Sequence, residues 1–282
     1  MTNPQLSLVA ALLDRSGSMH SIADDTRGGF DSFITKEREA DGRTMVTLAQ
    51  FDNRYELVYD SVPIADVDPL VLEPRGGTAL YDAIGRLVSE VGAGLAATPE
   101  NERPGSVTVF LMTVGHENSS REWTNSAVRE LIQRQEAEYN WDFVFLGSNI
   151  DAVEVGADLG FQPGKSMTYV STSVGVTAAF DSVADYQHRK RSAGIDAHSV
   201  SAFTPEDRTR ARGEYGRSST VPARHRRRWS ARHRRSYQAT DPASSKNPPR
   251  GPSSGRVASF SAICAPSSGV RVDANPVKSV AT

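Results

Sequence analysis

The sequence predicts an α/β fold with a doubly wound, mostly parallel six-stranded sheet, helices on both faces, and a disordered C-terminal tail. Over residues 1–208, apolar runs of strand length alternate with amphipathic segments of helical length, as is typical of parallel strands buried on both faces. Beyond residue 208 the apolar periodicity stops, and arginine, serine, proline and alanine dominate. We therefore place one folded domain at residues 1–208 and a basic tail at residues 209–282.

The individual elements follow from their apolar patterns. Strands are expected at residues 6–13, 44–51, 55–59, 107–113, 141–146 and 166–170. The run at 55–59 follows a short turn and should pair antiparallel with the run before it. Helices are expected at residues 22–39, 81–97, 152–159 and 174–188, with one more around residues 127–132 that Ser119 and Glu122 would start as a capping box. In a doubly wound sheet of strand order 3-2-1-4-5-6, the ligand site lies between the strands ending at Leu13 and Thr113.

Composition narrows the protein class. With 38% hydrophobic and 23% charged residues, the 282-residue chain resembles soluble globular proteins. It contains no apolar run long enough to span a membrane, and the first residues lack the basic segment of a signal peptide. Its single cysteine, Cys264, cannot form an internal disulfide, which fits a reducing compartment. We therefore expect a cytoplasmic protein that does not associate with membranes.

The net charge of −2 hides a strong division of charge along the chain. Residues 1–208 carry 17 basic and 31 acidic side chains, whereas residues 209–282 carry 15 basic and 3 acidic ones. The densest basic runs are at 224–228 and 232–235. Three interpretations stay open: an arm that binds nucleic acid or an acidic partner, a solvated tail without a selected role, and an out-of-frame extension.

The most informative motif directly follows the first apolar run. Asp14, Ser16 and Ser18 place a carboxylate and two hydroxyls within five residues at the end of a predicted buried strand, with Gly17 allowing close backbone approach. Hard cations such as Mg²⁺ prefer about six oxygen ligands of this kind. The motif therefore predicts a cation site at the carboxyl end of the sheet.

This Asp-x-Ser-x-Ser pattern resembles the metal-ion-dependent adhesion site (MIDAS) of von Willebrand factor A (VWA) domains. The segment from Arg75 to Ile84 begins with Arg-Gly-Gly-Thr before a predicted helix and resembles the threonine loop of that family. The resemblance implies that Thr78 is a third hydroxyl ligand. By itself Thr78 fits an ordinary helix N-cap equally well, and the upstream motif favours ligation.

The similarity to VWA domains continues through Gln50-Phe51-Asp52, residues 147–152 and the Phe203-x-x-Glu206-Asp207-Arg208 ending. It resembles the stand-alone intracellular VWA proteins of bacteria and their phages. The resemblance implies a Rossmann-like fold and a module that binds a partner protein, with a divalent cation coordinated by an acidic residue of that partner.

One position departs from the family pattern. VWA domains carry a second carboxylate after the strand that here ends in Met112-Thr113, and this chain has Val114 instead. Because valine cannot coordinate a cation, we expect Mg²⁺, or Mn²⁺ or Ca²⁺ in its place, to bind weakly. Glu117 and Asp52 are the candidates to replace the lost carboxylate or to support the ligands from behind.

The motifs of common enzymes do not fit. Residues 160–166 lack the spacing and the strand–loop–helix context of a phosphate-binding loop, and His116-Glu117 has no second histidine at zinc-protease spacing. We therefore expect a protein-interaction module with no catalytic activity. Metal-assisted phosphate hydrolysis at Asp14, a VWA scaffold that binds without metal, and nucleic-acid or acidic-partner binding through the tail are the alternatives.

Overall fold

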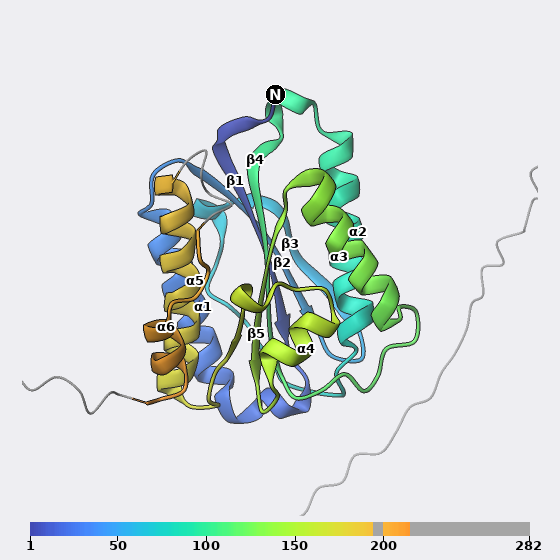
Figure 1. Ribbon diagram of the computed structural model, residues 1–282, viewed down its shortest axis with the longest axis vertical. Coiled ribbons are helices and arrows are strands. Elements are labelled where there is room, and N and C mark those ends of the chain that lie inside the picture. Colours follow the sequence, from blue (N-terminus) through green and yellow to red (C-terminus); the bar gives the residue numbers. More distant parts are fainter. Residues whose placement is uncertain (194–199, 215–282) are drawn as a thin grey trace, which may run out of the picture. The chain divides into compact units, whose positions relative to one another are not determined.

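The computed structural model describes residues 1–193 and 200–214 (Figure 1). Six strands form one sheet in the order β3-β2-β1-β4-β5-β6. They are β1 (Asn3–Asp14), β2 (Arg43–Phe51), β3 (Tyr55–Pro63), β4 (Pro104–Val114), β5 (Asp142–Ser148) and β6 (Ser166–Thr168). All neighbours pair in parallel except β2 and β3, which are antiparallel. The predicted fold class and strand order are confirmed.

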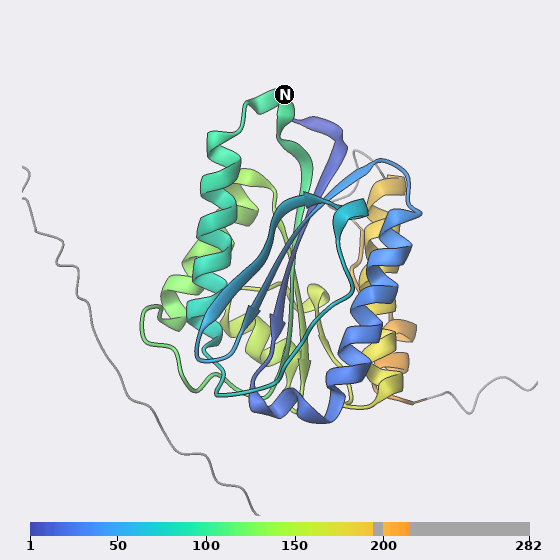
Figure 2. The same ribbon diagram turned by 180° about the vertical axis from the view of Figure 1, so that it is seen from behind.

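Helices cover both faces of the sheet (Figures 1 and 2). Within the described residues, the α-helices are α1 (Ala23–Arg38), α2 (Leu80–Ala97), α3 (Asn125–Tyr139), α4 (Ala152–Asp158), α5 (Ser173–Ala193) and α6 (Pro205–Ala211). Short 3-10 turns lie at Gly17–Ile22, Ile64–Asp66, Glu100–Glu102 and Pro163–Lys165. In the described residues, no helix has both the length and the apolar character needed to cross a membrane.

The two faces have separate cores because successive residues of β1 point to opposite sides. Leu13 belongs to the cluster beneath α1 and α5, and Leu12 belongs to the cluster beneath α2, α3 and α4. On the first face the α1 backbone comes so close to α5 that a Cβ on Gly29 would lie 2.4 Å from the ring of Phe180. Glycine at this position therefore sets the distance between the two helices.

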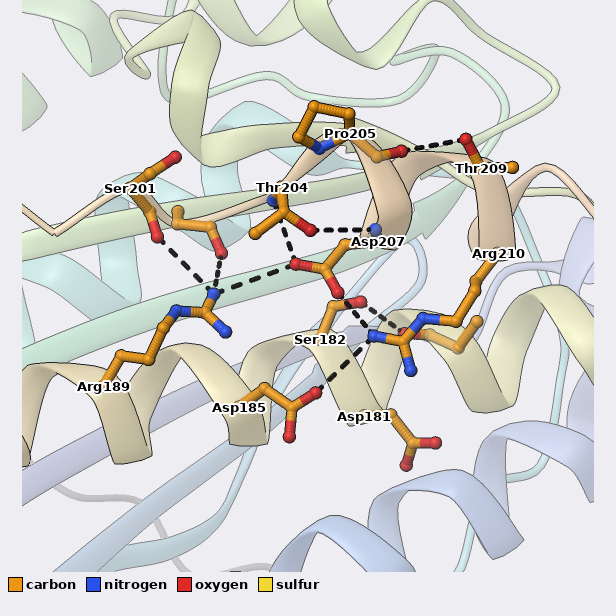
Figure 3. A network of polar contacts seen from close by, with 12 residues as sticks. Asp181, Ser182, Asp185, Arg189, Ser201, Thr204, Pro205, Asp207, Thr209 and Arg210 are labelled. Atoms are coloured by element: carbon orange, nitrogen blue, oxygen red, sulfur yellow. Dashed lines mark hydrogen bonds and ion pairs between the residues drawn. The ribbon is translucent and has the colours of Figure 1, made fainter. Parts of the chain in front are cut away.

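The short helix α6 is fixed to α5 by a polar network around Asp207 (Figure 3). Asp207 is 3% exposed, and it forms a capping box with Thr204 at the start of α6. Its carboxylate also pairs with Arg210 and, at 3.8 Å, with Arg189 of α5. Burial alone would raise the pKa of Asp207, but the hydrogen bonds from Thr204 and Arg210 outweigh it and lower that pKa. The carboxylate thus stays ionised and holds α6 against the domain.

A second buried ionic group lies at the amino end of the sheet, where β5 begins. The carboxylate of Asp142 is 2.7 Å from Nζ of Lys165 and 2.8 Å from Nζ of Lys190. Tyr186 donates a hydrogen bond of 2.5 Å to it. Burial alone would raise the pKa of Asp142, but the charges of Lys190 and Lys165 lower it overall. Removing this carboxylate would take away the ion-pair partner of Lys190 and leave Lys165 with the longer contact to Glu136, at 3.7 Å.

Two details differ from the sequence prediction. The helix α3 starts at Asn125 and is capped by Thr124, so the capping box predicted at Ser119 and Glu122 is wrong. The predicted domain boundary at residue 208 falls inside α6, which ends at Ala211, and the described residues continue to Glu214. The rest of the predicted tail, residues 215–282, lies outside the described residues, as do the basic runs within it.

Candidate functional site

The site is built around Asp14, the last residue of the central strand β1. Its side chain is completely buried. Oδ1 accepts a hydrogen bond of 2.6 Å from the main-chain N–H of Ser16. Oδ2 accepts one of 2.7 Å from Oγ1 of Thr113 and one of 3.2 Å from the main-chain N–H of Val114. The carboxylate thereby joins its own loop to the end of the neighbouring strand β4.

Burial raises the pKa of the Asp14 carboxyl above its usual value, and the hydrogen bonds from Thr113, Ser16 and Val114 oppose this rise. The buried phenol of Tyr169 donates a hydrogen bond to the main-chain oxygen of Thr113, and its pKa is raised by burial and by the charge of Asp14. The floor of the site is therefore a poorly solvated region in which a single acidic group is held by neutral donors.

The two serine hydroxyls form a short chain at the rim. Oγ of Ser18 donates to the main-chain oxygen of Val114 at 2.7 Å and lies 2.8 Å from Oγ of Ser16. Because Ser18 gives its one proton to Val114, Ser16 must donate to Ser18. Ser16 is buried and Ser18 is exposed, so the hydroxyl pair runs from the interior to the surface.

The loop that carries Thr78 lies directly beside the serine loop. The main-chain N–H of Arg75 donates to the oxygen of Arg15 at 2.7 Å, and the N–H of Gly17 donates to the oxygen of Gly76 at 3.1 Å. Gly76 has a φ of 69°, and a Cβ there would lie 2.4 Å from Oδ1 of Asn53. Glycine suits this position because its φ is positive, and a Cβ would also require the side chain of Asn53 to move.

Thr78 itself is 3% exposed and is held by Asn118 of the β4–α3 loop. Its N–H donates to Oδ1 of Asn118 at 2.9 Å, and its main-chain oxygen accepts from the N–H of Asn118 at 3.0 Å. The helix α2 begins two residues later, at Leu80, and its N-cap position is Ala79. The ordinary N-cap role considered for Thr78 is therefore not the one seen.

Val114 occupies the place where a second carboxylate was expected. Its side chain is 2% exposed and belongs to the apolar cluster that contains Met19 and Ile22. Its main-chain N–H and oxygen face Asp14 and Ser18, as described above. Position 114 thus supplies backbone groups to the site and an apolar side chain to the core.

The two carboxylates proposed as substitutes have other partners. Asp52 accepts hydrogen bonds from Nε of Arg15 and Nε of Arg75. Glu117 accepts from the main-chain N–H groups of Tyr81, Ser119 and Ser120. Asp52 therefore supports the loops from behind, and Glu117 fastens the β4–α3 loop to the start of α2.

Asp82, in the first turn of α2, has a role that its sequence position does not predict. Its carboxylate accepts hydrogen bonds from three successive main-chain N–H groups, at Arg121, Glu122 and Trp123, over 2.7–2.9 Å. These contacts keep residues 121–123 out of α3. A helix-start aspartate is common on any surface helix, so no local signal marks a carboxylate that organises a distant loop.

The arrangement brings one carboxylate and three hydroxyls, from Asp14, Ser16, Ser18 and Thr78, to adjoining loops at the carboxyl end of the sheet. These are hard oxygen donors and suit Mg²⁺ or a similar cation in type. They supply one formal negative charge, so water or a partner must complete the coordination. Across residues 1–193 and 200–214, no group of three His, Cys, Asp or Glu side chains could hold a metal ion.

Comparison with known proteins locates this architecture among solved structures. No protein-family model matches the sequence, and no curated protein matches it. Proximal thread matrix protein 1 from the mussel byssus is 14% identical, with a TM-score of 0.50 over 64% of this chain and 46% of that chain. The vWF domain of the pilus tip protein Mfa5 from Porphyromonas gingivalis is 12% identical, with a TM-score of 0.46. The match covers 67% of this chain and 96% of that chain. A von Willebrand factor type A structure from Catenulispora acidiphila is 13% identical, with a TM-score of 0.45. The match covers 66% of this chain and 43% of that chain.

The domain has the strand order and the layered arrangement of the von Willebrand factor A fold. The predicted resemblance is confirmed at the level of fold, and identities this low establish the fold alone. The chain matches less than half the length of the mussel protein. A further structure of that mussel protein has a zinc-occupied MIDAS motif. In this VWA-fold domain, the loops at Asp14 and Thr78 lie at the carboxyl end of the sheet, where doubly wound folds bind their ligands.

Proposed function

We propose that this domain binds a protein partner at the carboxyl end of its sheet, through the loops of Asp14, Ser16, Ser18 and Thr78. The observation that carries the proposal is the convergence of these oxygen donors on loops that hydrogen bonds hold together. Arg75 and Gly17 provide the direct main-chain links between the serine and threonine loops. A rigid, oxygen-rich patch at this edge of a doubly wound sheet is suited to recognition.

The hydrogen bonds that the Ser16 and Ser18 hydroxyls donate favour a binding role over a catalytic one. A nucleophilic serine needs a general base within hydrogen-bond reach. Here Ser18 donates to the main-chain oxygen of Val114, and Ser16 donates to Ser18. Phosphate hydrolysis assisted by metal normally uses several carboxylates around the ion, and the donor set offers Asp14 alone. We therefore propose that the domain is not an enzyme.

A divalent cation, Mg²⁺ first and Mn²⁺ or Ca²⁺ next, would sit among these four side chains and bind weakly. One carboxylate leaves most of the cation's charge uncompensated, and Asp14 already satisfies three protein donors. An acidic residue of the partner would supply the missing negative charge. The cation would thus act as a bridge between the domain and a carboxylate.

A metal-independent interaction is the second candidate, and one observation favours it. Both carboxylate oxygens of Asp14 are engaged with Ser16, Thr113 and Val114, so the loops need no ion to keep their arrangement. Such a scaffold would present the same surface and bind its partner equally well in a chelator.

The two candidates are separated by capture of partner proteins on the immobilised full chain, with Mg²⁺ or with EDTA, and by Ser18→Ala. The cation-bridged site predicts proteins that are retained in Mg²⁺, released by EDTA and lost with Ser18→Ala. Retention that EDTA does not change supports the metal-independent scaffold. Retention that survives both EDTA and Ser18→Ala places the interaction elsewhere and overturns the proposed site. Turnover of a phosphate ester that disappears in Asp14→Ala would overturn the non-enzymatic assignment.

A further inference from the structure

Behind the proposed site, the carboxylate of Asp52 pairs with Arg15 and Arg75, and Arg15 also pairs with Glu56 at 2.5 Å. Asp52, the residue after β2, is 3% exposed. Its Oδ2 accepts a hydrogen bond of 3.1 Å from Nε of Arg15 and one of 2.8 Å from Nε of Arg75. Arg15 lies inside the serine loop and Arg75 opens the threonine loop. One carboxylate oxygen therefore connects both loops.

Main-chain contacts strengthen this connection. The oxygen of Asp52 accepts from the N–H of Ala79 at 3.0 Å, on the far side of Thr78 from Arg75. Its Oδ1 accepts from the N–H of Arg54 at 2.8 Å, which fixes the side chain in the tight turn between β2 and β3. Asp52 thus binds the threonine loop at both ends, through Arg75 and Ala79. It also binds the serine loop through Arg15.

The charges in this group are arranged for a durable contact. The side chains of Arg15 and Asp52 are 7% and 4% exposed, and that of Arg75 is 56% exposed. Burial alone would raise the pKa of Asp52, but the hydrogen bonds from the Arg75 side chain and the Arg54 main chain, with the charges of Arg15 and Arg75, lower it. The carboxylate is therefore ionised at neutral pH, with Oδ2 bound to the two arginine side chains and Oδ1 bound to the main-chain N–H of Arg54.

We propose that Asp52, Arg15 and Arg75 form a clamp that fixes the gap between the serine loop and the threonine loop, and so position Ser16, Ser18 and Thr78 for a cation. The inference rests on the proposed function, since it assigns positioning residues to that same site. These three residues act through the loops and do not touch the cation.

Arg75→Gln tests the clamp, because the loss of its positive charge and the loss of its contact with Asp52 should change cation affinity in opposite directions. Loss of a nearby positive charge favours cation binding through space, whereas loss of the clamp weakens it. Arg54→Gln is the matched control, because it removes the same charge from an exposed side chain on the adjoining turn. The probe is Mn²⁺, followed by water-proton relaxation, which detects weak binding.

The clamp predicts that Arg75→Gln weakens Mn²⁺ binding by about 10-fold, as losses behind metal ligands typically do. Arg54→Gln should stay within about twofold of wild type or bind slightly tighter, since its charge is screened by solvent. Equal or tighter binding in Arg75→Gln would overturn the clamp while leaving the proposed cation site intact.

Hydrogen exchange supplies a measurement that needs no metal. The clamp predicts faster exchange of the main-chain amides of Gly17 and Arg75, which bridge the loops, in Arg75→Gln and not in Arg54→Gln. Unchanged exchange in Arg75→Gln overturns the clamp. Faster exchange in Arg75→Gln together with absence of Mn²⁺ binding in wild type supports the clamp and contradicts the cation site, so the two failures are distinguishable.

Discussion

Val114→Asp would place a carboxylate at the one position where the site departs from the MIDAS pattern. Without metal the substitution should be costly. Val114 is 2% exposed, and removing its buried methyl groups costs about 1–2 kcal/mol of unfolding free energy. The main-chain N–H of residue 114 already donates to Oδ2 of Asp14 at 3.2 Å, so the substitution would add a negative charge to the residue that binds this carboxylate. A buried charge without a partner adds about 2–3 kcal/mol, so we expect a total loss of about 3–5 kcal/mol.

Mg²⁺ should return much of this stability. If the wild-type site has a Kd of about 10 mM, then Mg²⁺ at about 10 mM stabilises the wild-type domain by only ~0.4 kcal/mol. An added carboxylate that tightens binding by about 100-fold raises the stabilisation of the variant at the same concentration to ~2.7 kcal/mol. The difference between these two responses is well above the error of a urea titration.

The assay is urea unfolding followed by tryptophan fluorescence, in EDTA and in Mg²⁺. Val114→Asn is the control, because it has nearly the same shape as Val114→Asp and lacks the charge. It should lose stability in EDTA and recover little in Mg²⁺. An equal response of the two variants would refute the assignment of position 114 to a cation site. A stabilisation of wild type by more than about 2 kcal/mol would show that the valine does not weaken the site.

Two further predictions concern the scaffold. Gly29→Ala should lower the unfolding free energy by about 1–3 kcal/mol, because its Cβ would lie 2.4 Å from the ring of Phe180. Gly28→Ala is the control, because a Cβ there has no atom within 4 Å, and it should be neutral or stabilising. Equal melting temperatures of the two variants would contradict this prediction. Asp142→Asn should cost about 3 kcal/mol at neutral pH, because it removes the buried carboxylate that pairs with both Lys165 and Lys190. The pKa of Asp142 in the folded protein lies below its ordinary value. Its contribution to the unfolding free energy is therefore complete above pH ~4 and is lost as the pH falls below that value. A stability difference between wild type and Asp142→Asn that persists unchanged to pH ~2.5 would contradict the assignment.

Much of the fold could be predicted because it depends on local patterns. The run from Leu6 to Leu13 is apolar at nearly every position, which is what a strand covered by helices on both sides requires. The turn from Asp52 to Arg54 is too short for a crossover helix, so β3 had to return antiparallel. Both expectations agree with the sheet.

The start of α3 could not be predicted in this way. Ser119 and Glu122 have the spacing of a capping box, but the main-chain N–H groups at residues 121–123 are bound by Asp82 of α2. A contact between residues about forty positions apart thus replaced a local one. Asp52 illustrates the same limit, because its pairing with Arg15 and Arg75 depends on how three loops meet.

The site itself divides along the same line. The residue types at Asp14, Ser16, Ser18 and Thr78 follow from their motifs, whereas the state of those groups depends on the fold. The sequence could not show that Asp14 is tied to Thr113 and Val114, nor that the side chain of Val114 faces an apolar core. The motifs therefore identify the oxygen donors, whereas the structure shows which of them already have hydrogen-bond partners that a cation must displace.

That availability suggests how a cation and a partner would depend on each other in the proposed complex. A cation approaching Asp14 competes with three hydrogen bonds for the carboxylate, whereas the hydroxyls of Ser16 and Ser18 can turn at little cost. The domain alone thus offers a weak site with one negative charge. A carboxylate from the partner supplies the second charge, and the cation in turn strengthens the hold on that carboxylate. By linkage each raises the affinity of the other by the same factor. The presence of the partner, more than the concentration of free cation, would then decide whether the site is filled.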